Sequence, residues 1–188
     1  MSNTIPDYLQ SLSVAVTAMQ SNADRIEAII AKLVAISKAG GKIMTCGNGG
    51  SAAEAMHLAE ELMGRYKRSR PPIAALCINS DPTAITCIAN DWEYAEVFAR
   101  QVAGLGQPGD ALVALSTSGK SPSILKALEQ ARAGGITTIG LLGPPGSPAE
   151  KLCDLALTFP PTTAASHVQE LQLVFIHMLL ERFDALHT

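Results

Sequence analysis

The chain has 188 residues and a net charge of −3 at pH 7, and it is 47% hydrophobic but only 16% charged. This length fits one domain, and the acidic balance argues against a nucleic-acid partner, which usually requires a clustered basic face. The charged fraction is well below the roughly 25% of an average soluble domain. We therefore expect self-association to cover part of the apolar surface.

Nothing in the chain predicts export or membrane insertion. The first ten residues lack the basic start and apolar run of a signal peptide, and His177 interrupts the longest apolar run, 173–180. That run is far shorter than the roughly 20 residues that cross a bilayer. The four cysteines form no CxxC pair. These features predict a cytoplasmic protein with no membrane partner.

In residues 5–39, apolar residues recur at the spacing of a helix. The pattern is interrupted at 21–24 by residues that commonly cap helices. These two segments predict an N-terminal helical hairpin. Beyond Gly40-Gly41, short continuous apolar runs predict strands, and helical segments separate most of them. The predicted strands are 42–46, 73–78, 111–115, 137–142 and 155–159, and the predicted helices between them are 51–69, 83–105 (in two pieces) and 122–133.

This alternation predicts an α/β domain with a five-stranded parallel sheet and helices on both faces, and residues 1–188 are expected to form that single domain. A long last helix, about 166–186, is apolar around most of its circumference. Such a helix is buried in a core or in a subunit interface. With the N-terminal helices, residues 1–40, it predicts a helical oligomer interface.

A glycine-rich loop, Cys46-Gly47-Asn48-Gly49-Gly50-Ser51, follows the first predicted strand and opens a helix. Free N–H groups at a helix start favour an anion, so a phosphate or sugar site is expected. The loop also satisfies the dinucleotide pattern GxGxxG/A, which is weak alone and needs an acidic residue about 20 positions on. Asp81 lies farther away, before a proline, so no nucleotide is predicted. A simple tight turn is the alternative.

A second loop, after the third strand, is rich in hydroxyl groups. Hydroxyls and free N–H groups at the start of a helix, here near Pro122, can cradle a phosphate. The alternative is ordinary N-capping by Ser121, which needs only one hydroxyl. Both loops follow parallel strands, where open α/β sheets bind their ligands. The four hydroxyls belong to Ser116, Thr117, Ser118 and Ser121.

Two pairs of polar residues lie on predicted helices. His57 and Glu61 are four residues apart and share one face, so they can bind a metal or move a proton, although such a pair is more often a surface contact. On the apolar last helix, burial would make His177 a neutral base, or simply a hydrogen-bonded core residue. The basic residues between Arg65 and Arg70 are interpreted as a solvated helix end rather than a substrate-steering patch.

Taken together, these motifs resemble the phosphoheptose isomerases of the SIS (sugar isomerase) family. The matching residues extend in order over nearly the whole chain: CGNGGS at 46–51, AMHLAEEL at 55–62, Asn90-Asp91, STSG at 116–119 with Ser121, and the Gln169…His177 pair.

The resemblance implies a role for each matched position. Glu61 and His177 correspond to the acid–base pair. Zinc, one ion per subunit, would be bound by His57, Glu61, Gln169 and His177. Substrate would be bound by Asn48, Gly49, Gly50, Ser51, Asn90, Asp91 and Gln169, and its phosphate by Ser116, Thr117, Ser118 and Ser121. The family further implies a homotetramer with active sites at subunit contacts.

The implied reaction is an aldose–ketose isomerisation of sedoheptulose 7-phosphate to D-glycero-D-manno-heptose 7-phosphate through an enediol. It would be the first step of bacterial ADP-heptose and lipopolysaccharide core precursor synthesis. Two alternatives remain open: a non-catalytic SIS module that binds a protein such as the replication initiator, and an isomerase of another ketose phosphate. The presence of both His57 and Glu61 favours the enzyme.

Overall fold

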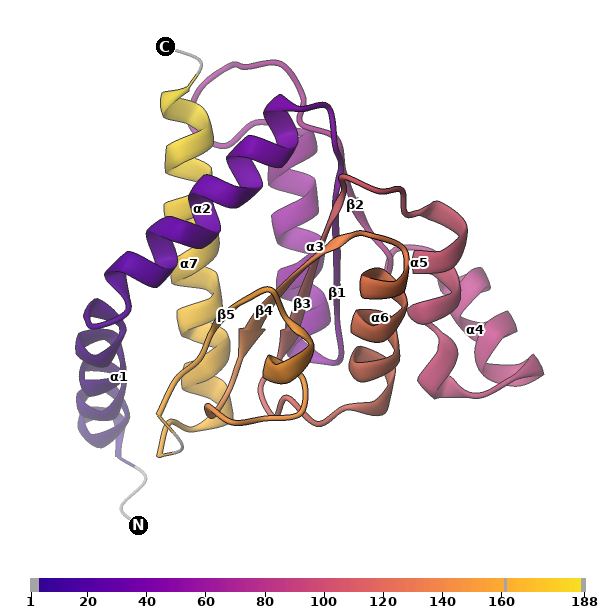
Figure 1. The fold of residues 1–188 in the computed structure, drawn as a ribbon. Coiled ribbons are helices and arrows are strands. Elements are labelled where there is room, and N and C mark those ends of the chain that lie inside the picture. Colours follow the sequence, from indigo (N-terminus) through magenta and orange to yellow (C-terminus); the bar gives the residue numbers. More distant parts are fainter. Residues whose placement is uncertain (1–3, 161, 187–188) are drawn as a thin grey trace.

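A computed structural model describes residues 4–160 and 162–186 and shows a parallel sheet between two layers of helices (Figure 1). Within these residues five strands pair in the order β2-β1-β3-β4-β5. The predicted five-stranded parallel sheet is therefore confirmed. The strands are β1 (Ile43–Gly47), β2 (Ala75–Cys77), β3 (Ala111–Ser116), β4 (Thr137–Leu142) and β5 (Leu155–Leu157).

Each face of the sheet is covered by its own helices (Figure 1). Successive strand side chains point to opposite faces, so Val113 joins one buried cluster and Leu112 the other. Because both faces are covered, apolar side chains predominate on both faces of the strands instead of alternating with exposed polar ones. One cluster includes α2 (Ala23–Lys38), α3 (Gly50–Met63) and α7 (Ala165–Ala185); the other includes α4 (Pro82–Asp91), α5 (Ala99–Leu105) and α6 (Pro122–Ala133).

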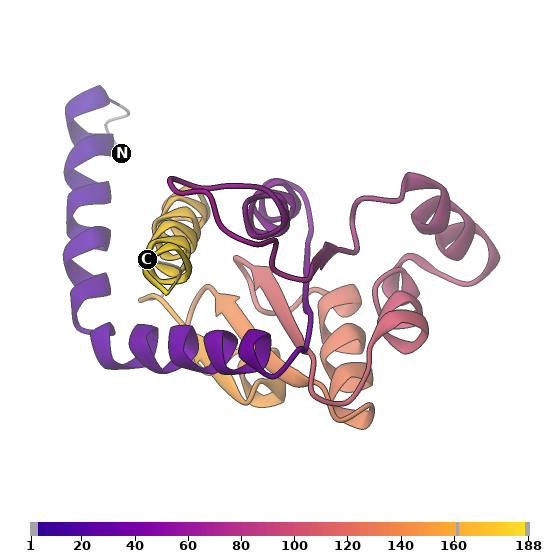
Figure 2. The same ribbon diagram turned by 90° about the horizontal axis from the view of Figure 1, so that it is seen from above.

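The two predicted N-terminal helices are confirmed, but they do not pack against each other as a close hairpin (Figure 2). In Figure 2, α1 (Ile5–Gln20) and α2 diverge at a wide angle instead of lying side by side. The reason is where the apolar residues of each helix are buried. Helix α2 buries five isoleucines and leucines, whereas α1 buries only Ala15 and Met19. Helix α2 packs on β5 and α7, and α1 projects as an arm that contacts α7.

Two helix predictions differ in their details. The helix predicted over 51–69 ends at Met63, and Gly64 follows it. The helical stretch predicted over 83–105 is indeed divided, into α4 and α5, with the short 3-10 helix η1 (Tyr94–Glu96) between them. A second 3-10 helix, η2 (Glu150–Leu152), precedes β5. In the described ranges no helix is long and apolar enough to cross a membrane.

The strand order places the two polar loops together. Strand β1 pairs with β2 on one side and with β3 on the other, and Gly47 is in register with Leu115. The direction of winding therefore reverses between β1 and β3, where open parallel sheets form their ligand crevice. The glycine loop and the hydroxyl loop (residues 116–121) meet at this point.

Candidate active site

The hydroxyl loop presents donors to a ligand. Ser116 Oγ accepts a hydrogen bond from Gly119 N at 3.1 Å, and Ser118 Oγ accepts one from Lys120 N at 3.2 Å. A hydroxyl that accepts a bond from the protein can still donate its own hydrogen. Ser121 occupies the N-cap position of α6, but its side chain makes no capping bond. The capping alternative therefore does not describe Ser121, and its hydroxyl serves another purpose.

The turn of this loop depends on Gly119. Its φ is +61°, a conformation that favours glycine, and a Cβ at this position would collide with the Ser147 side chain. The turn directs the loop toward the first turn of α6, whose dipole favours an anion. Thr117 beside it is half-buried, and Ser118 is exposed. Together these features have the chemistry that would suit a phosphate group.

Asn48 joins the glycine loop to the hydroxyl loop. Its Nδ2 donates to Ser121 Oγ at 2.9 Å and to Ser123 Oγ at 3.0 Å. The predicted proximity of the two loops is thus a direct contact. Both amide hydrogens of Asn48 are used, so this side chain braces the hydroxyl loop and is not free to donate to a sugar. Ser123, just beyond the predicted phosphate loop, was not identified from the sequence.

Four other substrate-binding candidates lie where the glycine loop meets α7. The Ser51 hydroxyl is buried and donates to Gln172 Oε1 at 3.2 Å, so it ties α3 to α7. Gln169 lies directly over Gly50, where an added Cβ would collide with the Gln169 amide. The structure therefore brings Gly50 and Gln169 together, and Gly49 precedes them as the N-cap of α3.

Asn90 and Asp91 are exposed at the end of α4. Asn90 Nδ2 donates to Asp91 Oδ1 at 2.9 Å, and the Cys87 thiol contacts Asp91 Oδ2. Their side chains bond to each other and to Cys87 rather than to either loop. The segment that follows them returns to the glycine loop at Asn48, through Tyr94.

The proposed acid–base residues meet where α3 and α7 lie side by side. His57 Nε2 lies 3.5 Å from Glu61 Oε1, and the rings of His57 and His177 are 5.5 Å apart between centroids. Tyr66 stacks on the His177 ring at 5.7 Å. Glu61 Oε2 is buried and has no hydrogen-bond partner among the described residues. A buried carboxylate oxygen without a partner is costly, so this atom is poised for a ligand or a proton.

The same cluster has suitable donors for a metal ion. Ligand atoms of His57, Glu60 and Glu61 all lie within 4.8 Å of one another. Imidazole nitrogens and carboxylate oxygens are ordinary zinc ligands, and the unpartnered Glu61 oxygen supplies one of them. The residues present therefore fit zinc at the His57–Glu61 end. Gln169, the fourth predicted ligand, lies beside Gly50 instead.

The sequence of the chain is similar to those of known proteins. The SIS domain family model matches residues 7–143. The chain is 46% identical over 169 residues to a phosphoheptose isomerase of Bradyrhizobium sp. strain BTAi1, a match that covers 90% of this chain and 83% of that protein. The chain belongs to the phosphoheptose isomerase family of SIS-domain proteins. The phosphoheptose isomerase of Akkermansia muciniphila is 40% identical over 181 residues, covering 96% of this chain and 95% of that protein.

A solved structure agrees with this membership in the phosphoheptose isomerase family. The phosphoheptose isomerase from Neisseria gonorrhoeae superposes with a TM-score of 0.88 at 30% sequence identity, over 96% of both chains. The sequence-based family resemblance and the predicted SIS fold are therefore confirmed. The family members are sugar-phosphate isomerases, and the hydroxyl loop at the sheet's ligand crevice is the candidate site for the phosphate.

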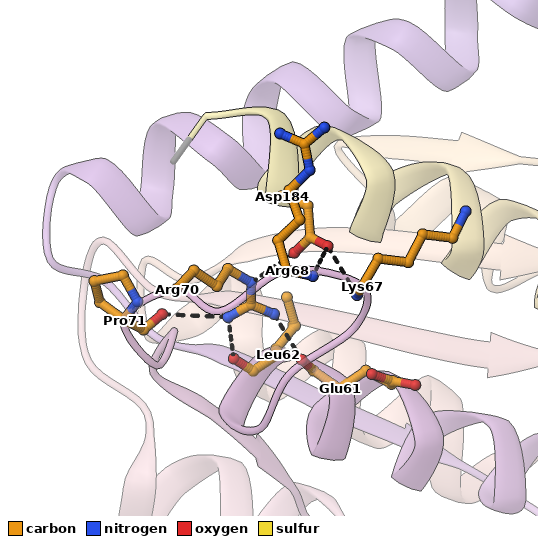
Figure 3. Close-up of polar contacts among 7 residues, drawn as sticks. All are labelled: Glu61, Leu62, Lys67, Arg68, Arg70, Pro71 and Asp184. Atoms are coloured by element: carbon orange, nitrogen blue, oxygen red, sulfur yellow. Dashed lines mark hydrogen bonds and ion pairs between the residues drawn. The ribbon is translucent and has the colours of Figure 1, made fainter. Parts of the chain in front are cut away.

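A buried ion pair holds together the two helices that carry the candidate acid–base residues (Figure 3). Arg70 Nε donates to Asp184 Oδ1 at 3.1 Å, and their side chains are 0% and 4% exposed. The guanidinium also donates to the carbonyls of Glu61 at 2.6 Å and Leu62 at 2.9 Å. The last basic residue is thus a buried cap on α3, and the interpretation of a solvated helix end is wrong for Arg70.

Asp184 accepts further bonds from the loop that follows α3. The backbone N–H groups of Lys67 and Arg68 donate to Asp184 Oδ2 at 2.9 and 3.0 Å (Figure 3). Burial raises the pKa of Asp184, but these bonds and the Arg70 guanidinium outweigh it and hold the pKa below its usual range. Asp184 is therefore a carboxylate that fastens α7 to the end of α3.

We expect Arg70→Met to destabilise the protein by about 3–5 kcal/mol, because it leaves the Asp184 charge buried without its partner. The control is Arg68→Met, which makes the same chemical change at an exposed side chain and should cost less than about 0.5 kcal/mol. Urea unfolding measures both. Equal stabilities for the two variants would show that the Arg70–Asp184 pair does not hold the helices together.

Glu54, which the sequence did not single out, lies one turn before His57 on α3. Burial, and then the negative charge of Glu170, raise the pKa of Glu54 to about 7. Its Oε2 is buried and has no hydrogen-bond partner in the described part of the chain. Close to neutral pH, Glu54 therefore exchanges a proton beside the proposed site.

Glu54→Gln keeps the shape of this side chain and removes its ionisation. The folded protein retains a proton on Glu54 that an unfolded glutamate, with a pKa of 4.5, has already lost. Stability therefore falls as the pH rises from about 4.5 to about 7. We therefore expect the melting temperature of Glu54→Gln, relative to that of the wild type, to increase as the pH rises over this interval. Glu129→Gln, at an exposed site, is the control, and parallel curves would contradict the assignment.

Proposed function

We propose that this member of the phosphoheptose isomerase family interconverts sedoheptulose 7-phosphate and D-glycero-D-manno-heptose 7-phosphate, with Glu61 and His177 as its proton carriers. The observation that carries this assignment is the unpartnered, buried oxygen of Glu61 beside His57 and His177. A carboxylate and an imidazole at one site supply the acid and the base that the reaction needs.

The substrate's phosphate would bind at the hydroxyl loop. Ser116, Ser118 and Ser121 can each donate a hydrogen there, and the α6 dipole favours the negative charge. This binding is remote from the reacting carbons. Its free energy would hold the sugar in position for the chemistry instead of acting on the bonds that change.

The isomerisation moves two hydrogens. One proton carrier removes a proton from C1 of the open-chain ketose, and the electron pair forms the C1–C2 double bond of an enediol(ate). The hydroxyl proton on O1 is transferred to O2, and a proton returns at C2 to give the aldose. Opening the sugar ring beforehand uses an acid and a base as well. Glu61 and His177 are proposed to perform these transfers.

Zinc is the cofactor that these donors would accept. His57 and Glu61 would hold it, with His177 beside them, and when bound it would polarise the carbonyl and hydroxyl oxygens of the substrate. Gln169 precedes His177 by eight residues, about 12 Å along α7. Gln169 would therefore complete the ligand set only if the side chains converge or a partner subunit contributes.

The two alternative functions have less support. A non-catalytic protein-binding module would have no use for the unpartnered Glu61 oxygen beside two histidines. An isomerase of another ketose phosphate would use the same residues, but curated relatives at 40–46% identity are phosphoheptose isomerases. We place the enzyme in the cytoplasm, because all four cysteines are free thiols, as expected in a reducing compartment.

Glu61→Gln is expected to lower turnover of sedoheptulose 7-phosphate by about 10²- to 10⁴-fold, the usual contribution of one acid–base group. Proton NMR of the aldose product measures the rate. Glu129→Gln removes a charge on the exposed surface of α6 and should leave the rate unchanged. Near-normal turnover by folded Glu61→Gln would refute its role.

The zinc site is tested in the same assay on the wild type. A chelator should stop turnover, and added zinc should restore it. If turnover continues after the metal has been removed, the zinc site is excluded.

The oligomer interface is proposed to involve α1, α2 and α7. We expect residues 1–188 to form one domain whose first 40 residues help to assemble a homotetramer. A groove of about 620 Å³ is lined mainly by apolar side chains of all three helices, with Gln20, Glu27, Glu181 and Arg182 also in its lining. On α1, Ile5, Leu9 and Val16 share one face by their spacing and are 78%, 58% and 40% exposed. Such an apolar stripe is typical of an interface.

Replacing Leu9 by Glu would bury a charge in this interface, so we expect Leu9→Glu to dissociate the tetramer. The neighbouring Gln10→Glu adds the same charge on another face of α1 and should assemble normally. Size-exclusion chromatography with light scattering measures both masses. Identical masses for the two variants would show that this face of α1 lies outside the interface.

A further inference from the structure

The segment between α4 and α5 returns to the phosphate site through a single side chain. The Tyr94 hydroxyl donates to Asn48 Oδ1 at 2.7 Å. Asn48 is the residue whose amide holds Ser121 and Ser123. A continuous path of hydrogen bonds therefore leads from Tyr94, through Asn48, to the start of α6.

The direction of these bonds decides what the serines can offer. Because the Tyr94 hydroxyl donates to the amide oxygen of Asn48, the amide nitrogen faces Ser121 and Ser123 and donates to both. The opposite orientation of the amide would turn its oxygen toward the serines, where it would accept the hydroxyl hydrogens itself. In the orientation that the structure shows, with the Tyr94 hydroxyl on the amide oxygen, Asn48 takes neither serine hydrogen.

The hydrogen bonds of the two serines then determine where the Ser121 hydroxyl hydrogen points. Ser123 is only 1% exposed, so its hydroxyl hydrogen must find a partner inside the protein. Asn48 already donates to it, which leaves Ser121 Oγ, at 3.2 Å, as the acceptor. Ser121 Oγ consequently accepts two hydrogen bonds. Its own hydrogen is left to point out of the loop, toward a phosphate oxygen.

Tyr94 is held in place although it is 54% exposed. Lys126 Nζ donates to Glu96 at 2.6 Å and also contacts Glu93. It therefore binds the segment on both sides of Tyr94. Lys126 belongs to α6, the helix that the hydroxyl loop opens. The Arg100 guanidinium lies 3.7 Å from the centre of the Trp92 ring, which fixes the start of the segment.

We infer that Tyr94 is a positioning residue for phosphate binding: it sets the orientation of the Asn48 amide, and through it directs the Ser121 hydroxyl at the substrate's phosphate. This inference deepens the proposed function and rests on it for the identity of the substrate. Tyr94 acts through Asn48 and is not assigned any contact with the reacting carbons.

The test compares Tyr94→Phe with Tyr8→Phe. The control removes a hydroxyl with a bond of the same length, 2.7 Å, to Glu170. For Tyr94→Phe we expect the KM for sedoheptulose 7-phosphate and the dissociation constant of inorganic phosphate to rise together, by about 3- to 10-fold, the effect of one hydrogen bond. Its kcat and melting temperature should stay close to those of the wild type, and Tyr8→Phe should change neither constant.

Ser123→Ala gives a second measure of the same path. Tyr94→Phe, through Asn48, and Ser123→Ala both act on the Ser121 hydroxyl, so the double variant should weaken phosphate binding by less than the product of the single effects. Simple multiplication of the two effects would overturn the inference, as would an unchanged KM and phosphate constant in Tyr94→Phe.

The two hypotheses fail in different ways. If the wild type does not convert sedoheptulose 7-phosphate, the proposed function fails, yet weaker binding of inorganic phosphate by Tyr94→Phe, measured by thermal-shift titration, would still support the role of Tyr94. If the wild type is active and Tyr94→Phe binds phosphate normally, the inference fails and the proposed function stands.

Discussion

The buried ion pair between Arg70 and Asp184 fixes the relation of α3 to α7, and the candidate acid–base site depends on that relation. A buried charge is tolerated only with a partner and a full set of hydrogen bonds. Here the guanidinium bonds Asp184 and the last carbonyls of α3, including that of Glu61. The cap that ends α3 is therefore also the fastening of α7, on which His177 lies.

The site divides into two regions with different physical chemistry. At the carboxyl ends of β1 and β3, neutral hydroxyls and a helix dipole suit a dianionic phosphate without using any buried charge. Between α3 and α7, Glu61 has a buried carboxylate oxygen without a hydrogen-bond partner among the described residues, and this is the basis of its proposed role. In the proposed function, this separation of affinity from chemistry would let the phosphate anchor the sugar while the reacting carbons lie beside Glu61.

The low charge content of the chain is evident on α1, the N-terminal arm, which exposes an apolar face. Helix α2 uses its apolar stripe on the sheet and α7, so little remains to bury α1. The exposed face with Ile5, Leu9 and Val16 is consequently too apolar for a helix meant to remain in water.

The sequence by itself determined the parallel sheet, the two ligand loops and the family. These features are local, since strand periodicity, glycines at a turn and hydroxyls before a helix are each written in a few adjacent residues. Only the tertiary structure decided that Asn48 braces the hydroxyl loop, that the Arg70 side chain is buried, and that α1 diverges from α2. Those outcomes join residues far apart in the chain, such as Tyr94 and Asn48, 46 positions away. Such pairs depend on how strands and helices pack, and no local pattern encodes that.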